Sequence, residues 1–97
     1  MKGCVSMEFV HERNRVFANN ENGEMIAEVT FPNVAGEAVA IDHTYVDPLL
    51  RGQHVASDLM EEAYGQIKAD GKKAYASCPY AASWFRKHPE KADILLK

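Results

Sequence analysis

One amphipathic helical pattern, placed between two strand-like segments, determines much of the topology open to this chain of 97 residues. Four apolar residues recur at four-residue intervals, the spacing of a helix that buries one face: Val55, Leu59, Ala63 and Ile67. Residues 37–46 are rich in Val, Ile, Thr and Tyr and predict a long strand, while residues 73–78 predict a short one. Two strands joined by a helix of this length normally run parallel through a right-handed crossover, so we expect these two strands to pair in parallel.

The part of the chain before this unit predicts an antiparallel meander. Residues 25–31 alternate between apolar and other side chains, as a half-buried strand does. The dipeptide Asn22-Gly23 predicts a two-residue hairpin turn, since both residues tolerate positive φ, and residues 15–20 supply the partner strand. Residues 32–36 predict a second turn.

The C-terminal part predicts further helix. Pro79 suits the first position of a helix. That helix cannot continue smoothly through His88-Pro89, because a residue before proline avoids the α region, and residues 89–96 predict a last helical turn or two. The expected fold class is α+β: a mixed sheet with an antiparallel N-terminal meander, then a β-α-β unit and C-terminal helices, in a single domain of residues 1–97.

Charge and composition exclude several classes of protein. The net charge of −3 argues against a nucleic-acid binder, whose phosphate contacts need a basic excess. No stretch approaches the ~20 apolar residues that span a bilayer, and residues 1–8 contain no run of signal-peptide length. Cys4 and Cys78 have neither metal nor redox spacing, and the histidines are scattered. We therefore expect a cytoplasmic protein, a monomer or weak homodimer, with no metal, nucleic acid or membrane bound.

Residues 50–56, Leu-Arg-Gly-Gln-His-Val-Ala, join the long strand to the amphipathic helix. The first N–H groups of a helix lack partners and carry partial positive charge. Gly52 lets the backbone approach a ligand closely, and Arg51 adds a cation, so this segment has the ingredients of an anion site. The alternative is a plain glycine-containing helix entry beside a surface arginine.

Residues 46–56 resemble the acetyl-CoA signature of the GNAT acetyltransferase superfamily, written Q/R-x-x-G-x-G/A. Backbone amides of this turn hold the diphosphate of the co-substrate in that family. Arg51 and Ala56 match the outer positions of the signature, whereas His54 stands where the family usually has glycine. The resemblance implies that acetyl-CoA is bound by a set of turn residues: Val46, Arg51, Gly52, Gln53, His54, Val55 and Ala56.

Three more segments extend the resemblance to residues 15–95. Residues 41–46, 76–80 and 85–90 recur in this order in small stand-alone GNAT-like proteins of about a hundred residues, which are predicted acetyltransferases. The resemblance implies an acetyl-CoA-dependent N-acetyltransferase that acts on an unidentified amine of a small molecule or peptide. The alternatives are a non-catalytic acyl-CoA-binding or sensing module, which the short chain favours, and a small interaction protein that keeps only the fold.

Cys78 is a candidate nucleophile on physical grounds. Ligands gather beyond the carboxyl ends of parallel strands, and Cys78 and the turn at residues 51–56 follow two such ends. Because Cys78 precedes Pro79, it is expected at a helix N-cap, where a thiol pKa falls and the thiolate is favoured. An acetyl group could then pass through Cys78 to the acceptor. The alternative is an inert small residue that ends a strand; the matching cysteine of the small GNAT-like proteins has been proposed as catalytic.

His43 is the second catalytic candidate. It is expected on one strand face with Val39, Ile41 and Tyr45, where a lone histidine is usually a hydrogen-bonded core residue. The resemblance offers another interpretation, because related enzymes often place a base near this point to deprotonate the acceptor amine. An imidazole with a pKa near neutrality suits that task.

Two features of the last helix have a structural and a functional interpretation. Tyr80 and Trp84 are four residues apart and predict core contacts, or alternatively the wall of an acceptor pocket. Arg86, Lys87 and His88 form a basic cluster that could face the 3′-phosphate of coenzyme A. The simpler interpretation is a solvated helix end, where cations are favourable.

Overall fold

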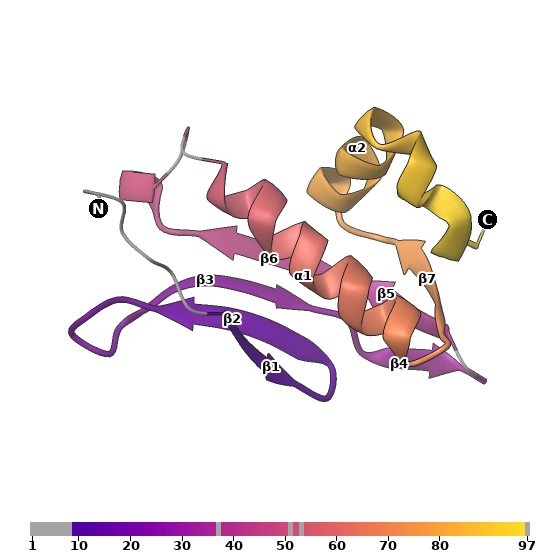
Figure 1. Cartoon of the computed structure of the whole chain (residues 1–97), viewed down its shortest axis with the longest axis horizontal. Helices are drawn as coiled ribbons and strands as arrows, with labels where there is room; N and C mark the ends of the chain where they lie inside the picture. Colours follow the sequence, from indigo (N-terminus) through magenta and orange to yellow (C-terminus); the bar gives the residue numbers. More distant parts are fainter. Residues whose placement is uncertain (1–8, 37, 51, 53, 97) are drawn as a thin grey trace.

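The computed structural model describes residues 9–36, 38–50, 52 and 54–96 (Figure 1). The strands in chain order are β1 (Phe9–Glu12), β2 (Arg15–Asn19), β3 (Met25–Thr30), β4 (Asn33–Ala35), β5 (Ala38–Ile41), β6 (His43–Val46) and β7 (Lys73–Ala76). The helices are α1 (Val55–Ala69) and α2 (Pro79–Lys87), with 3-10 turns η1 (Pro48–Leu50) and η2 (Pro89–Ile94). This element order confirms the expected α+β class with its meander, β-α-β unit and C-terminal helices.

The described strands form two sheets rather than the single mixed sheet that was expected. The first sheet has the order β1-β2-β3-β6 and is antiparallel throughout, and the second has the order β4-β5-β7. Within the second sheet β5 and β7 run parallel, as predicted, and α1 connects the two sheets (Figure 1). Strand β1 was not predicted, and the short strand β4 occupies part of the segment interpreted as a turn.

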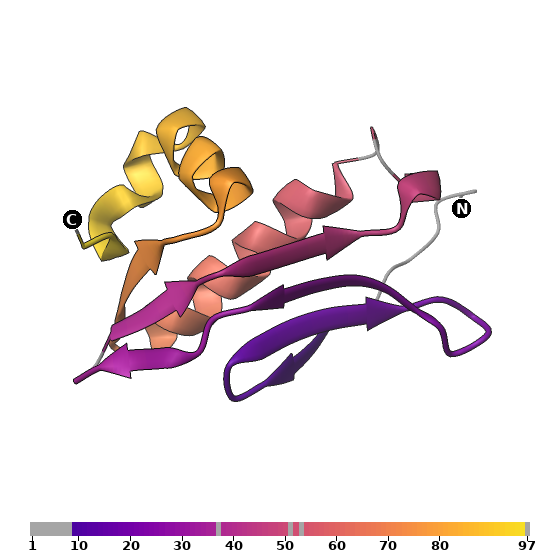
Figure 2. The ribbon, with the colours of Figure 1, turned by 180° about the vertical axis from the view of Figure 1, so that it is seen from behind.

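The long strand predicted at residues 37–46 is in fact two strands that meet at Asp42. Two hydrogen bonds from Thr30 fix Asp42 at this junction. The Thr30 hydroxyl donates to Asp42 Oδ1 at 2.7 Å, and the Thr30 carbonyl accepts the Asp42 N–H at 3.2 Å. Before Asp42 the chain pairs with β7, and after it the chain pairs with β3. In Figure 2 the magenta strands β5 and β6 follow one another, β5 in the second sheet and β6 in the first. One continuous segment therefore serves both sheets.

The first hairpin turn also differs from the prediction. The turn runs from Asn20 to Glu24, whose backbones are joined by an N–H···O bond of 2.8 Å. Gly23 has φ 82°, but Asn22 is not in the positive-φ region. The side-chain Oδ1 of Asn20 instead accepts the N–H groups of Asn22 and Glu24, at 2.9 and 3.0 Å. The expected two-residue turn was wrong because the asparagine side chain stabilises a longer loop.

The buried face of α1 matches the predicted pattern. The helix buries one stripe of residues against the first sheet: Val55, Leu59, Met60, Ala63 and Ile67. Gly71 follows the helix with φ 70°, the left-handed position that commonly ends a helix. Burial of such a stripe drives the helix onto the sheet. The start of α1 is thereby held at the end of β6, where the candidate site lies.

The N-terminal hairpin is tied to α1 by polar side chains. Gln66 donates both amide hydrogens to backbone carbonyls, of Glu12 at 2.7 Å and of Arg13 at 3.2 Å. Its oxygen therefore faces His11 Nδ1 at 2.5 Å, while His11 Nε2 faces a Glu62 oxygen at 2.7 Å. Burial lowers the pKa of His11, but its bonds to Gln66 and Glu62 and the charge of Glu62 raise the pKa above its ordinary value. The imidazolium form, which donates from both nitrogens, satisfies both acceptors.

Helix α2 packs its aromatic face into the core. Trp84 and Phe85 are buried, with ring centroids 5.1 Å apart in an edge-to-face arrangement. The Trp84 indole N–H donates to Ser57 Oγ of α1 at 3.0 Å, and its ring stacks on His88 with centroids 4.3 Å apart. The helix ends at Lys87 with His88 as its C-cap, in agreement with the break predicted at His88-Pro89, and η2 follows. These contacts fix α2 against the first turn of α1.

Candidate functional site

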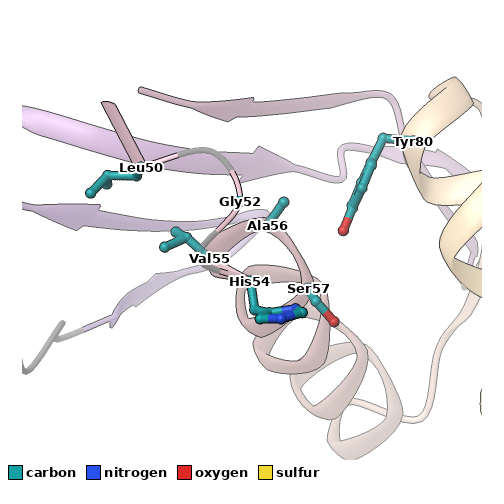
Figure 3. A pocket seen from close by; sticks show the side chains of 7 residues that line it. All are labelled: Leu50, Gly52, His54, Val55, Ala56, Ser57 and Tyr80. Carbon is teal, nitrogen blue, oxygen red and sulfur yellow. The ribbon is translucent and has the colours of Figure 1, made fainter. Parts of the chain in front are cut away.

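A cavity of about 260 Å³ lies where α1 begins (Figure 3). Seven residues line it: Leu50, Gly52, His54, Val55, Ala56, Ser57 and Tyr80. Four of these are predicted co-substrate contacts, and Arg51 and Gln53 of the same prediction lie outside the described residues. Val46 ends β6 and packs partly buried against the core, before η1 leads to the cavity.

The turn into α1 has left-handed backbone at two of its described residues. Gly52 has φ 85° and His54 has φ 62° and ψ 16°. A Cβ built on Gly52 would meet nothing within 4 Å, so the requirement for glycine is conformational rather than steric. His54 is the N-cap of α1 and its carbonyl accepts the Asp58 N–H at 3.0 Å, but its side chain makes no capping bond. The first amides of α1 therefore remain free of intrahelical partners beside the cavity.

The backbone of His54 leads to a stability prediction. A left-handed residue with a Cβ costs about 1–2 kcal/mol, from which the extra chain entropy of glycine, about 0.5–1 kcal/mol, is subtracted. We expect His54→Gly to raise the free energy of unfolding by about 0.5–1 kcal/mol, measured by urea denaturation. The control His54→Ala removes the imidazole and keeps the strained backbone, so it should show no gain. Equal stabilisation by alanine and glycine would contradict the assignment of strain to φ.

Cys78 occupies the N-cap of α2, as predicted, with extended backbone and Pro79 in the first turn. The thiol is buried, and its Sγ shares a hydrogen bond of 3.4 Å with Thr44 Oγ1 of β6. Burial raises the pKa of the Cys78 thiol, but bonds from the Thr44 hydroxyl and from the backbones of Ala81, Tyr80 and Thr44 lower it below the ordinary value. The thiolate, which is the nucleophilic form, is therefore more accessible here than in an ordinary thiol.

Tyr80 links Cys78 to the cavity. It follows Cys78 by two residues on α2 and faces the first turn of α1 across the cavity (Figure 3). Burial and the charge of Asp58 raise the pKa of Tyr80, so its hydroxyl remains a proton donor at neutral pH. Trp84 instead lies in the core, as the structural interpretation predicted. The two predicted halves of the site, the turn and Cys78, are thus connected through one turn of α2.

His43 lies on a different face from Cys78. Successive side chains of a strand point to opposite faces, and the neighbour Thr44 is the residue that contacts Cys78. The His43 side chain is 54% exposed, with Nε2 3.6 Å from a Glu28 oxygen. Tyr45 shares this exposed face of β6, as predicted, but Val39 and Ile41 are fully buried in the separate strand β5, so their place on the same face and the core interpretation of His43 are wrong. Its role as a base stays a prediction.

Two contacts of this site were not predicted from the sequence. Thr44 touches the thiol, and Ser57 lines the cavity while accepting the Trp84 indole N–H. The alternation along residues 43–46 could have assigned Thr44 to the face opposite His43, but not its contact with Cys78. Arg86 and Lys87 are exposed in the last turn of α2, and their contact with a 3′-phosphate stays a prediction.

The described residues contain no group of three or more His, Cys, Asp or Glu side chains placed to hold a metal ion. None of the helices in this part of the chain has the length and apolar character needed to cross a bilayer.

Comparisons with known proteins agree with this geometry. Residues 15–94 match the family of GCN5-related N-acetyltransferases. The solution structure of a GCN5-like protein from Staphylococcus aureus, assigned as an N-acetyltransferase, is 27% identical, with a TM-score of 0.76 over 92% of this chain and 87% of that one. A search of curated proteins found no match.

Larger acetyltransferases share part of the fold. An acetyltransferase from Bacillus cereus is 28% identical, with a TM-score of 0.55 over 69% of this chain and 44% of that one. A structure assigned as a phosphinothricin N-acetyltransferase is 25% identical, with a TM-score of 0.59 over 80% of this chain and 53% of that one. This chain thus spans about half the length of these two proteins. With a family match that covers most of its length, the chain belongs to the GCN5-related N-acetyltransferases, a family of acyltransferases.

Proposed function

We propose that this protein is an acetyl-CoA-dependent N-acetyltransferase that uses Cys78 to move the acetyl group to an amine of a small molecule or peptide. The observation that carries the proposal is the cavity at the start of α1, one turn of α2 away from a buried thiol of lowered pKa. Family membership supports the reaction class, and the two features supply an anion site and a nucleophile.

The turn before α1 suits the diphosphate of the co-substrate. Gly52 and His54 are left-handed, and the amides that follow open the helix beside the cavity. Free N–H groups and the helix dipole together favour an anion at this position. The hydroxyl groups of Ser57 and Tyr80 line the same cavity and can donate further hydrogen bonds. The residues that line the cavity therefore fit the diphosphate of the co-substrate.

The edge of β6 offers a place for the extended arm of the co-substrate. Among the described strands β6 pairs with β3 alone, so its other edge keeps backbone donors and acceptors available. An extended chain can add to such an edge through backbone hydrogen bonds. The arm would then run from the cavity along Val46 toward Thr44, whose hydroxyl contacts Cys78.

Transfer through Cys78 is a thioester exchange followed by aminolysis. The Cys78 thiolate forms a bond to the acetyl carbon, the carbon–sulfur bond to coenzyme A breaks, and the departing thiolate takes up a proton. The acceptor amine then forms a carbon–nitrogen bond, the bond to Cys78 Sγ breaks with its electron pair left on sulfur, and the amine proton passes to water. Direct transfer with His43 as base is the competing route.

An intact-mass experiment tests the proposal. Acetyl-CoA is added to the native protein, to Cys78→Ala and to the matched control Cys4→Ser, and both protein mass and released coenzyme A are recorded. We expect one acetyl group on the native protein and on Cys4→Ser, and none on Cys78→Ala. Retention of full turnover by Cys78→Ala with a mixture of amines would overturn the covalent route in favour of direct transfer.

A non-catalytic acyl-CoA-binding module is the second candidate, and the position of His43 favours it. That histidine points away from the face on which Thr44 meets Cys78, so the described residues place no imidazole beside the thiol. Binding of acetyl-CoA without an adduct or turnover would select this candidate. Failure of millimolar acetyl-CoA to bind or to raise the melting temperature would overturn both.

A further inference from the structure

We infer that Thr44 is a positioning residue that stabilises the Cys78 sulfur as a thiolate. It does so when the sulfur attacks the acetyl carbon and again when the sulfur leaves acetyl-Cys78. The inference rests on the proposed use of Cys78 as the nucleophile. Its observation is the 3.4 Å contact between Oγ1 of Thr44, in β6, and Sγ of Cys78, at the N-cap of α2, two residues that are 34 positions apart in sequence. A thiolate has no hydrogen, so in that state the threonine hydroxyl is the donor.

The backbone on both sides of the contact is fixed. Thr44 pairs with Val29 in the antiparallel ladder of β6 and β3, and its β-branched side chain has few rotamers. On the other side, the N–H groups of Ser77 and Cys78 donate to the Ile41 carbonyl, at 3.1 and 2.9 Å. Ile41 ends β5 just before the junction at Asp42, and Thr44 lies two residues beyond that junction. The junction between the two sheets therefore brings the hydroxyl and the sulfur together.

Thr44 differs from the other groups around the sulfur because its donor can turn. The backbone groups of Tyr80 and Ala81 that approach Cys78 are held by α2, whereas a hydroxyl rotates about its C–O bond. An acetylated sulfur is a poor acceptor, so the hydroxyl gains a strong bond only when the thiolate forms again. The same contact thus favours attack on the first thioester and departure from acetyl-Cys78 in the aminolysis step.

The test measures the thiol directly and needs no co-substrate. In a Cys4→Ser background, the rate of Cys78 alkylation by iodoacetamide is followed from about pH 5 to about pH 10 for Thr44, Thr44→Val and Thr44→Ser. Valine has nearly the same shape without the hydroxyl, and serine keeps the hydroxyl. We expect valine to move the midpoint of the profile to higher pH and to reduce the rate near neutrality about tenfold, as expected for loss of one bond to a charged group. Serine should restore most of the rate.

Several outcomes would overturn the inference. An unchanged midpoint in Thr44→Val would do so, as would a serine variant shifted as far as valine. If valine lowers the melting temperature strongly, Thr44→Ala is compared with Thr44→Ser at a temperature where both are folded, and equal profiles overturn the inference. A shifted profile in a protein that binds no acetyl-CoA would support the role of Thr44 and overturn the proposed function, so the two failures are distinguishable.

Discussion

The variant Ala56→Glu is expected to bind coenzyme A at least about a hundredfold more weakly than the native protein, while its melting temperature stays the same or rises. Ala56 is the second residue of α1 and lines the cavity. A carboxylate there repels the diphosphate and competes for the same amides. The fold does not suffer, because a negative charge in the first turn of a helix interacts favourably with its dipole. Isothermal titration calorimetry and thermal melts followed by circular dichroism measure the two effects.

The matched control is Ala56→Gln, which has nearly the size of glutamate without its charge. We expect only a several-fold loss of affinity from glutamine, since steric interference remains and repulsion does not. Raising the salt concentration should recover part of the binding lost by glutamate. Native affinity in Ala56→Glu would show that the diphosphate binds elsewhere and would contradict the assignment of the cavity.

Replacement of Trp84 by alanine is expected to lower the free energy of unfolding by about 3–5 kcal/mol, the usual range for removing a buried aromatic side chain. The substitution deletes the edge contact with Phe85, the stack on His88 and the donor to Ser57. For a small domain this is a large share of a total that is commonly about 5–15 kcal/mol. Urea denaturation followed by circular dichroism measures the change.

Trp84→Phe is the control for this experiment because it keeps an aromatic ring and loses the indole N–H. We expect it to cost about 1–2 kcal/mol, for the lost bond to Ser57 and the smaller buried area. A cost below about 1 kcal/mol for Trp84→Ala would mean that α2 is held without its tryptophan. The packing that places Cys78 and Tyr80 beside α1 would then need another explanation.

The helices were the most predictable part of the fold. Local signals define them: the four-residue pattern of α1, and Pro79 and Pro89 at the starts of α2 and η2. The structure confirms each of these positions. It also confirms the parallel pairing of β5 with β7, because a helical crossover leaves few alternatives.

The strand junction at Asp42 was not predictable from the same signals. Residues on both sides of it have strand-forming composition, and the change of partner depends on Thr30, which is twelve residues away in sequence. The junction also affects the candidate site, because it determines on which face of β6 the side chains of His43 and Thr44 lie. The placement of the turn and of Cys78 at a helix N-cap was predicted from local sequence, whereas the contact of Thr44 with Cys78 joins residues 34 positions apart.

Because Thr44 and Cys78 are 34 positions apart in sequence, the reactivity of the Cys78 thiol depends on completed folding. In an unfolded chain Cys78 is an ordinary thiol, which is mostly protonated at neutral pH. The first turn of α2 is next to the sulfur in sequence, but Thr44 reaches it only after the C-terminal third has docked on the middle of the chain. In a nascent or misfolded molecule the Cys78 thiol therefore reacts slowly with electrophiles. The protein acquires the full reactivity of this thiol only in its native state.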